Sequence, residues 1–159
     1  MAAVQRVEVI KSVQSSESFE NNVEDESTLS NKQWISRVTA NQSAFIIGAF
    51  EGDELIGVAG FAQALKEKIK HKSYLWGVFV KQEYRGKYIA NDMLSKLVYI
   101  AFQNNDISQI QLTVASENEA AISLYEKLGF RRYGTEVDSL RVSGNSYDEI
   151  LMAYVTAER

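Results

Sequence analysis

Apolar and polar residues alternate in short runs along most of the chain, and in two places the period lengthens from that of a strand to that of a helix. Apolar residues every three or four positions predict two helices, at residues 89–104 and 118–128. Two shorter helices are expected at residues 15–26 and 30–38, the second after a capping-box sequence. The alternating runs predict strands at residues 5–13, 44–50, 55–61, 74–80, 107–114, 132–137 and 147–155.

The connections between these runs indicate how the strands pair. Gly52 lies between the second and third strands, and a glycine that can adopt a positive φ is typical of a tight hairpin. A second turn is expected at Ser143-Gly144-Asn145. The strand–helix–strand unit over residues 74–114 requires a right-handed crossover and parallel pairing. We therefore expect one α/β domain over residues 1–159, with a mixed, mostly antiparallel, twisted sheet of about seven strands flanked by about four helices.

The composition narrows the available chemistry. The 159 residues include no cysteine and one histidine, His71, so disulfides and thiolate metal sites are excluded and we expect no metal site or Ser/His nucleophile. The formal net charge is -4, and an acidic chain without a long basic stripe is a poor candidate for nucleic-acid binding. No apolar run approaches the ~20 residues that span a bilayer. No signal segment is expected, so we expect a cytoplasmic protein without a membrane partner.

Residues 77–90 run from a predicted strand through a short turn into a helix. The unpaired N–H groups and the dipole at a helix start attract anionic oxygens. Gly86 and Ala90 allow the backbone to approach a ligand closely, and Arg85 and Lys87 add positive charge. The segment can therefore hold a pyrophosphate, although small residues at such a turn are more often needed for steric reasons alone.

Residues 118–130 form a second segment of interest, Asn-Glu-Ala-Ala-Ile-Ser-Leu-Tyr-Glu-Lys-Leu-Gly-Phe. Asn118 and Tyr125 are two helical turns apart, so both lie on one side of the predicted helix. Gly129 is placed to end that helix in a left-handed cap. Two alternatives stay open: Tyr125 can be a core aromatic, and Asn118 can be a helix cap in competition with the capping box of Ser116.

The two segments together resemble motifs of the GCN5-related N-acetyltransferases, the GNAT family. Residues 118–130 match the family's Asn-x-x-Ala-x-x-Leu-Tyr-x-x-x-Gly-Phe pattern at every named position. Residues 85–90 match its Arg/Gln-x-x-Gly-x-Gly/Ala pattern, except that Tyr88 stands where the family has its middle glycine. A bulky residue there can crowd the phosphates unless its side chain points outward. The predicted order of strands and helices also follows the family's along nearly all of the chain.

The resemblance implies a GNAT-like fold, acetyl-CoA as co-substrate and no metal. It places the pantetheine arm against the backbone of residues 78–80, where an N–H near Val78 can serve the oxyanion, and the pyrophosphate against the turn and helix start. It implies that Tyr125 is catalytic and donates a proton to the departing thiolate, while Asn118 contacts the cofactor arm. The cofactor-binding residues implied are Val78, Phe79, Val80, Arg85, Gly86, Lys87, Tyr88, Ile89, Ala90, Asn91, Asn118 and Tyr125.

The base that would deprotonate the amine is not evident. Relatives often place a glutamate on the fourth or fifth strand, and the matching positions here hold Leu75 and Thr113. Glu24, Asp25 and Glu26 can bind a cationic acceptor or relay a proton, although such acids are more often simply solvated. We therefore name no base. The acceptor site is expected to come from variable loops such as residues 15–30 and 138–147.

The expected function is an N-acetyltransferase that moves the acetyl group of acetyl-CoA directly to a primary amine of a small molecule or peptide. The alternative is a non-catalytic acyl-CoA-binding or interaction module, motivated by Tyr88 and by the missing glutamate. A nucleotide-binding protein is a more distant alternative, because the chain has no Walker or dinucleotide glycine pattern. The expected partners are acetyl-CoA and an amine acceptor, and the resemblance also raises a homodimer.

Overall fold

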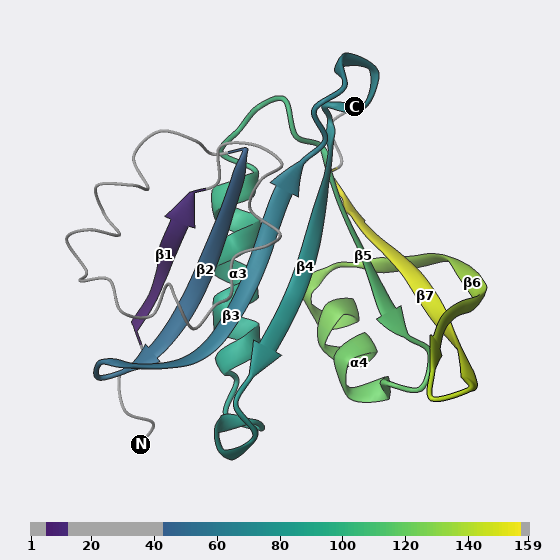
Figure 1. Ribbon diagram of the computed structural model, residues 1–159. Coiled ribbons are helices and arrows are strands. Elements are labelled where there is room, and N and C mark those ends of the chain that lie inside the picture. The colour runs from purple at the N-terminus through teal and green to yellow at the C-terminus, as the bar shows by residue number, and fades with distance from the viewer. Residues whose placement is uncertain (1–5, 13–42, 157–159) are drawn as a thin grey trace. The chain divides into compact units, whose positions relative to one another are not determined.

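The computed structural model describes residues 6–12 and 43–156, and the side chains of residues 10–12 are not described (Figure 1). The strands and helices follow one another along the chain in an order close to the one expected from the sequence. They are β1 (Arg6–Ser12), β2 (Ala44–Glu51), β3 (Glu54–Gln63), η2 (Glu67–Ile69), β4 (Lys72–Val80), η3 (Gln82–Tyr84), α3 (Ile89–Ala101), β5 (Gln109–Ala115), α4 (Glu119–Leu128), β6 (Arg131–Val142) and β7 (Asn145–Val155).

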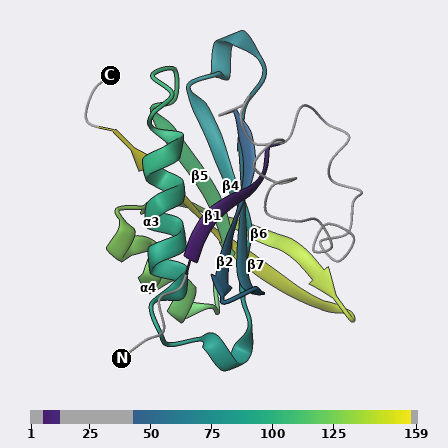
Figure 2. The same cartoon turned by 90° about the vertical axis from the view of Figure 1, so that its left-hand side faces the viewer.

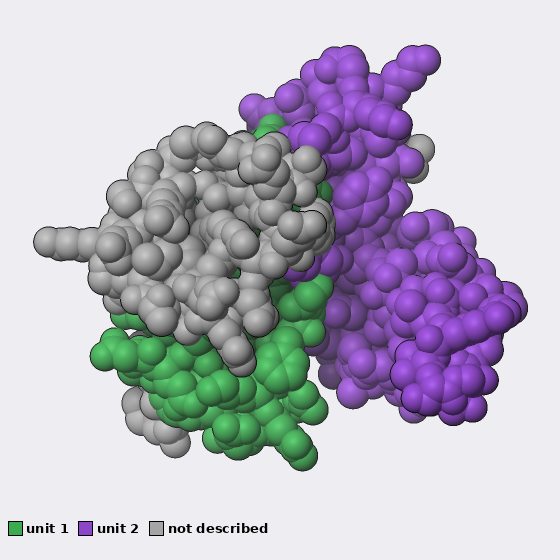
Figure 3. Space-filling view, viewed as in Figure 1, with its two compact units in different colours: residues 1–62, 77–104 green, residues 63–76, 105–159 purple. Residues whose placement is uncertain are grey.

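The strands form a seven-stranded sheet in the order β1-β2-β3-β4-β5-β7-β6. The pairs β1–β2, β2–β3, β5–β7 and β6–β7 are antiparallel, and β4–β5 is parallel. This confirms the mixed, mostly antiparallel sheet and the parallel crossover pair. The chain divides into two compact units, residues 1–62 with 77–104 and residues 63–76 with 105–159 (Figure 3). Strand β4 therefore contributes residues to both units. The single domain expected over residues 1–159 stays a prediction.

The first unit packs α3 against one face of its strands, as Figures 1 and 2 both show. On the strands, Phe45 lies directly opposite Phe61, with 4.9 Å between the ring centroids. On the helix, Ile89, Met93 and Leu97 recur every four residues and are at most 2% exposed. Burying each such side chain stabilises the fold by about 1.5–3 kcal/mol, so the apolar stripe of α3 accounts for its position.

The second unit builds its core from β5, β7 and the C-terminal end of α4. Ile110 and Leu112 alternate with exposed or half-buried residues along β5, as expected for a strand buried on one face. The ring of Phe130 lies edge-on to that of Tyr125 at 5.9 Å and to that of Tyr154 at 5.7 Å between centroids. This aromatic row joins the end of α4 to the last strand.

Gly129 ends α4 for two separate reasons. Its φ of 109° lies in the left-handed region, and its N–H donates to the carbonyl oxygen of Glu126, as predicted for a C-cap glycine. In addition, a Cβ at this position would lie 2.7 Å from Cε2 of Tyr154. Any side chain here would therefore strain the backbone and press into the aromatic row.

The helices differ from the prediction in number and detail. About four helices were expected, and the described part of the chain contains two α-helices; the other two were expected at residues 15–26 and 30–38, outside the described residues. α3 ends at Ala101 rather than at residue 104. The N–H of Asn104 donates to the carbonyl oxygen of Ala101, three residues earlier, so the last turn is tighter than an α-helix. The buried residues of α4 are Ile122 and Tyr125.

Residues 138–147 were expected to form a loop, and this prediction is wrong. β6 continues to Val142 and is joined to β7 by a two-residue turn, in which Ser143 has φ 51° and Gly144 has φ 81°. A bulge displaces the β6–β7 register between Glu136 and Leu140. The turn itself matches the prediction, but the strands beside it are longer than their polar sequence suggested.

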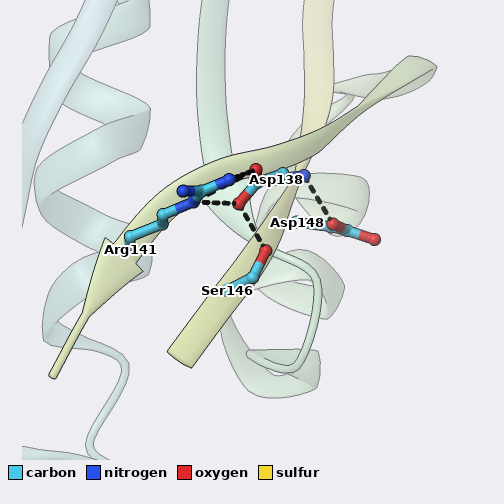
Figure 4. A network of polar contacts seen from close by, with 4 residues as sticks. All are labelled: Asp138, Arg141, Ser146 and Asp148. Carbon is cyan, nitrogen blue, oxygen red and sulfur yellow. Dashed lines mark hydrogen bonds and ion pairs between the residues drawn. The ribbon is translucent and has the colours of Figure 1, made fainter. Parts of the chain in front are cut away.

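A polar network around Asp138 explains why so polar a segment forms a hairpin (Figure 4). Asp138 has φ 53°, and its N–H donates to Oδ1 of Asp148 at 2.8 Å. Its carboxylate accepts from Nε of Arg141 at 2.9 Å and from Oγ of Ser146 at 2.6 Å. The polar side chains of the two strands thus provide each other's hydrogen-bond partners. A pattern of apolar residues cannot predict such contacts.

Candidate functional site

A tight turn joins β4 to α3 in the first unit. At its start, the N–H of Lys81 donates to the carbonyl oxygen of Ile56 at 2.9 Å, and the chain then makes the short η3 helix. Gly86 follows with φ 76° and has no atom within 4 Å of the position where a Cβ would lie. The glycine is therefore needed for its backbone conformation, and the space beside it is open.

The first N–H groups of α3 have no acceptor within the helix. The first bond of its ladder runs from the N–H of Asp92 to the carbonyl oxygen of Tyr88, at 3.0 Å. The N–H groups of Ile89, Ala90 and Asn91 precede it, and the N-cap residue Tyr88 provides no side-chain hydrogen bond. These amides, at the positive end of the helix dipole, can bind anionic oxygens such as those of a diphosphate.

Tyr88 has a left-handed backbone conformation, which is unusual for a residue other than glycine. Its φ of 62° and ψ of 14° are left-handed, a region that costs a residue with a Cβ about 1–2 kcal/mol. Its side chain is 79% exposed. At this position glycine would adopt the same backbone conformation without strain, and the tyrosine side chain extends into solvent.

Arg85 and Lys87, the two cations that flank Gly86, are both held by neighbouring groups. Nε of Arg85 donates to the carbonyl oxygen of Val80 at 2.9 Å, and its guanidinium lies 5.7 Å from the ring centroid of Phe79. Nζ of Lys87 lies 5.3 Å from the ring centroid of Tyr84. Arg85 thus links the turn to the end of β4 by a hydrogen bond, while the ammonium of Lys87 lies over an aromatic ring.

β4 carries a local distortion immediately before the residues expected to meet the pantetheine arm. Gly77 has φ 61° inside the strand, which marks a kink that other residues adopt poorly. After it, Val78 is half-buried, Phe79 is 53% exposed and Val80 is buried. The candidate residues 78–80 and 85–91 therefore lie close together in sequence at one end of the first unit, whereas the two remaining candidates belong to the second unit.

Asn118 is the N-cap of α4. Its Oδ1 accepts from the N–H of Ala121 at 3.1 Å, which fixes the helix start. Of the two caps considered from the sequence, the structure thus has Asn118 rather than Ser116, whose N–H donates to the carbonyl oxygen of Asp148. A contact of Asn118 with a cofactor stays a prediction.

Tyr125 lies on the buried face of α4. Only 7% of it is exposed, and its ring packs edge-on against Phe130. Burial raises the pKa of its hydroxyl above the usual value, so the group is protonated at neutral pH. It is therefore part of the core, as one of the alternatives had it, and it also keeps the proton that an acid catalyst needs.

Sequence reasoning missed one group of residues around the turn. Nζ of Lys81 lies 2.8 Å from Oε1 of Glu54, and the hydroxyl of Tyr84 donates to Oε2 of the same carboxylate at 3.2 Å. Glu54 is the first residue of β3, at the hairpin that the sequence predicts around Gly52. The partners are 27 and 30 residues away in sequence, and no periodic pattern marks such a contact.

The family model described as "Acetyltransferase (GNAT) family" matches residues 8–130, which include the turn and both α-helices. This chain belongs to the GNAT family. The [ribosomal protein uS5]-alanine N-acetyltransferase of Escherichia coli is 30% identical to it over 118 residues, 73% of this chain and 60% of that protein. The chain thus spans 60% of the length of this relative.

Solved acetyltransferase structures share the fold. A GNAT acetyltransferase from Streptococcus pneumoniae matches with a TM-score of 0.71 at 20% identity, over 81% of this chain and 79% of that chain. The protein yncA from Salmonella typhimurium, solved with its cofactor acetyl-CoA, matches with a TM-score of 0.69 at 19% identity, over 80% and 72% of the two chains. The seven-stranded, mostly antiparallel sheet is thus the GNAT fold.

Two further observations describe this GNAT chain. Within residues 6–12 and 43–156, no helix is long and apolar enough to cross a membrane. Across the same residues, histidine, aspartate and glutamate side chains form no group of three or more suited to a metal ion.

Proposed function

We propose that this protein is an acetyl-CoA-dependent N-acetyltransferase, which moves the acetyl group directly to a primary amine of a small molecule or peptide. The observation that carries the proposal is the uncapped start of α3, within the region that the GNAT family model matches. The relative from Escherichia coli is named for transfer to an alanine of a ribosomal protein, which supports an amine acceptor.

The turn and α3 would hold the diphosphate of the cofactor. The N–H groups of Ile89, Ala90 and Asn91 supply hydrogen-bond donors at the positive end of the helix dipole. Gly86 and Tyr88, both left-handed, give the chain the curvature that brings it from the end of β4 into α3. Residues 78–80 would pair their backbone with the pantetheine arm, and Asn118 would contact the same arm from α4.

Acetyl-CoA supplies an activated acyl group and a thiolate leaving group. The lone pair of a neutral amine forms the new bond to the acetyl carbon, while the carbon–sulfur bond breaks and its electron pair stays on sulfur. An amine with a pKa of about 10.4 costs roughly 4.6 kcal/mol to neutralise at pH 7, so a base or a water relay must take its proton. We assign that role to no residue.

Tyr125 would meet the departing thiolate. With ordinary pKa values of about 10 for tyrosine and about 8.5 for a thiol, complete proton transfer is uphill by roughly 2 kcal/mol. Burial raises the pKa of Tyr125 further, which makes complete transfer harder and keeps the hydroxyl protonated. A hydrogen bond with partial transfer therefore describes its role better than full donation.

Release of free thiol from acetyl-CoA across a broad panel of amines tests the activity. For the role of Tyr125, Tyr125→Phe removes the hydroxyl and keeps the ring, and we expect kcat to fall by about 100-fold or more. The Kd for CoA, measured by calorimetry, should change little. Tyr99→Phe, at a position 67% exposed on α3, is the matched control and should leave both unchanged.

The outcomes separate the possibilities. Full activity in Tyr125→Phe would leave Tyr125 as core packing only. Binding of CoA without turnover of any amine would replace the proposed enzyme by an acyl-CoA-binding module. No binding of CoA would overturn the proposal altogether.

The proposal includes three further expectations. The family resemblance raises a homodimer, and light scattering measures whether one forms. A cytoplasmic location is expected, and cell fractionation measures it. One domain over residues 1–159 is expected, and a single cooperative unfolding transition would support it.

A further inference from the structure

The carboxylate of Glu54 holds the turn between β4 and α3 at two points. Its Oε1 pairs with Nζ of Lys81 at 2.8 Å, where the turn begins, and its Oε2 accepts from the hydroxyl of Tyr84 at 3.2 Å, in the middle of the turn. The pKa of the Glu54 carboxyl is lowered, first by its hydrogen bond from Lys81. One side chain at the start of β3 thus fixes two residues of a segment that follows the next strand.

A second carboxylate stands at the same hairpin end. Glu51 lies directly opposite Glu54 in the β2–β3 register, an arrangement that destabilises a hairpin unless the charges are matched. A hydrogen bond with Glu51 is the main cause of the raised pKa of Tyr84. Both carboxylates raise the pKa of the Tyr84 hydroxyl, and Lys81 supplies a balancing charge.

Tyr84, which is held by Glu54, in turn contacts Lys87. The ammonium of Lys87 lies over the Tyr84 ring, 5.3 Å from its centroid, within the range of a cation–π contact. The phenol oxygen is held by Glu54 while the ring face holds the ammonium. Lys87 directly precedes Tyr88, the N-cap of α3, so its charge is kept near the amides of the helix start.

We propose that Glu54 is a positioning residue for cofactor binding, and that it acts through Tyr84 to place the Lys87 ammonium where the anionic phosphates of coenzyme A bind. The inference rests on the proposed function. Glu54 would not itself contact the cofactor, and its negative charge has the wrong sign for binding phosphate.

Because a carboxylate repels phosphate, a direct effect of its charge and a positioning effect predict opposite changes in the Kd for coenzyme A. If Glu54 influenced the site only through its charge, Glu54→Gln would remove a repulsion and tighten CoA binding. If Glu54 positions Lys87, the same change weakens binding, because a neutral glutamine holds the Tyr84 hydroxyl less firmly and the ring beneath the ammonium is then less well placed. Asp53→Asn removes the same charge from the same hairpin, at an exposed residue that takes no part in the contacts described above, and serves as the matched control.

The experiment measures Kd for coenzyme A by calorimetry in the full chain. We expect Glu54→Gln to raise Kd by roughly two- to fivefold, the range of one exposed cation–π contact, and Asp53→Asn to lower it slightly or leave it unchanged. Tyr84→Phe, which keeps the ring and loses the hydroxyl, should weaken binding in the same direction. Circular dichroism and thermal unfolding establish that each variant is folded.

A double-mutant cycle with Lys87→Met distinguishes positioning from a general structural effect. If Glu54 acts through Lys87, Glu54→Gln has no further effect on Kd once Lys87 is replaced. An equal effect in both backgrounds, or tighter binding in Glu54→Gln alone, would overturn the inference. Failure of the wild-type chain to bind coenzyme A would overturn the proposed function instead, so the two failures are distinct.

Discussion

Tyr88→Gly should stabilise the protein, although it removes a large side chain. Tyr88 has φ 62°, and relief of the left-handed conformation gains about 1–2 kcal/mol. Glycine also makes the unfolded chain more flexible, which costs about 0.4–1 kcal/mol. The side chain is 79% exposed, so little buried area is lost. The balance is a stabilisation between zero and about 1.6 kcal/mol, and a gain of 1 kcal/mol raises Tm by about 2–4 °C in a chain of this length.

Urea unfolding at constant m measures this change. Two variants isolate its cause. Tyr88→Ala removes the ring but keeps a Cβ in the left-handed region, so it should gain almost nothing. Tyr99→Gly makes the same substitution at an exposed residue inside α3, where glycine should destabilise by about 0.5 kcal/mol. A loss of stability in Tyr88→Gly as large as that in Tyr99→Gly would refute the argument from backbone strain.

The same variant tests how the turn meets its ligand. If the phosphates contact backbone N–H groups, as proposed, Tyr88→Gly keeps or tightens binding of CoA. A large rise in Kd would mean that the Tyr88 ring itself contacts the cofactor.

Three further changes test the second unit. Gly129→Ala should destabilise the protein by about 2 kcal/mol or more, because it combines left-handed strain with a clash against the Tyr154 ring. Urea unfolding measures this change, and an unchanged stability would contradict the explanation of the helix cap. Ser73→Ala should lower the free energy of unfolding by about 1 kcal/mol, since the buried hydroxyl donates to the carbonyl oxygen of Gln109 in β5 at 2.8 Å. An unchanged urea midpoint would show that this hydrogen bond does not contribute to stability. The pKa of Asp138 is lowered, first by Arg141, so its contribution to stability is present above the unfolded pKa of about 3.9 and is lost as the pH falls through the lower folded pKa. The difference in urea midpoint between wild type and Asp138→Asn should therefore shrink from pH 7 to pH 2, and a constant difference would contradict this.

Local patterns in the sequence determined much of the fold. The apolar residues of α3 recur with a helical period, and Ile89, Met93 and Leu97 are indeed buried. Gly52 and Gly144, both with positive φ, lie at the hairpin turns where they were expected. These features depend on residues close together in the chain, which is why they could be predicted.

Features that depend on distant residues could not be predicted in the same way. The extension of β6 relies on Asp138 meeting side chains of β7, and the turn before α3 relies on Glu54 meeting Lys81 and Tyr84. From the sequence, residues 138–147 were expected to form a loop, and residues 77–90 a short turn between a strand and a helix that can hold a pyrophosphate. For the candidate site, the helical period predicted that α3 begins at residue 89, but not that Tyr88 before it would have a left-handed backbone conformation.

The bulge in β6 has a consequence for how the protein behaves at high concentration. β6 is last in the strand order and 12 residues long, and Tyr133 and Val137 on it are more than half exposed. A straight strand of this kind would offer another copy of the chain a ready template for β-pairing and, in time, for aggregation. The register shift at Asp138, with a charged pair beside it, interrupts that template near its centre and so favours colloidal solubility.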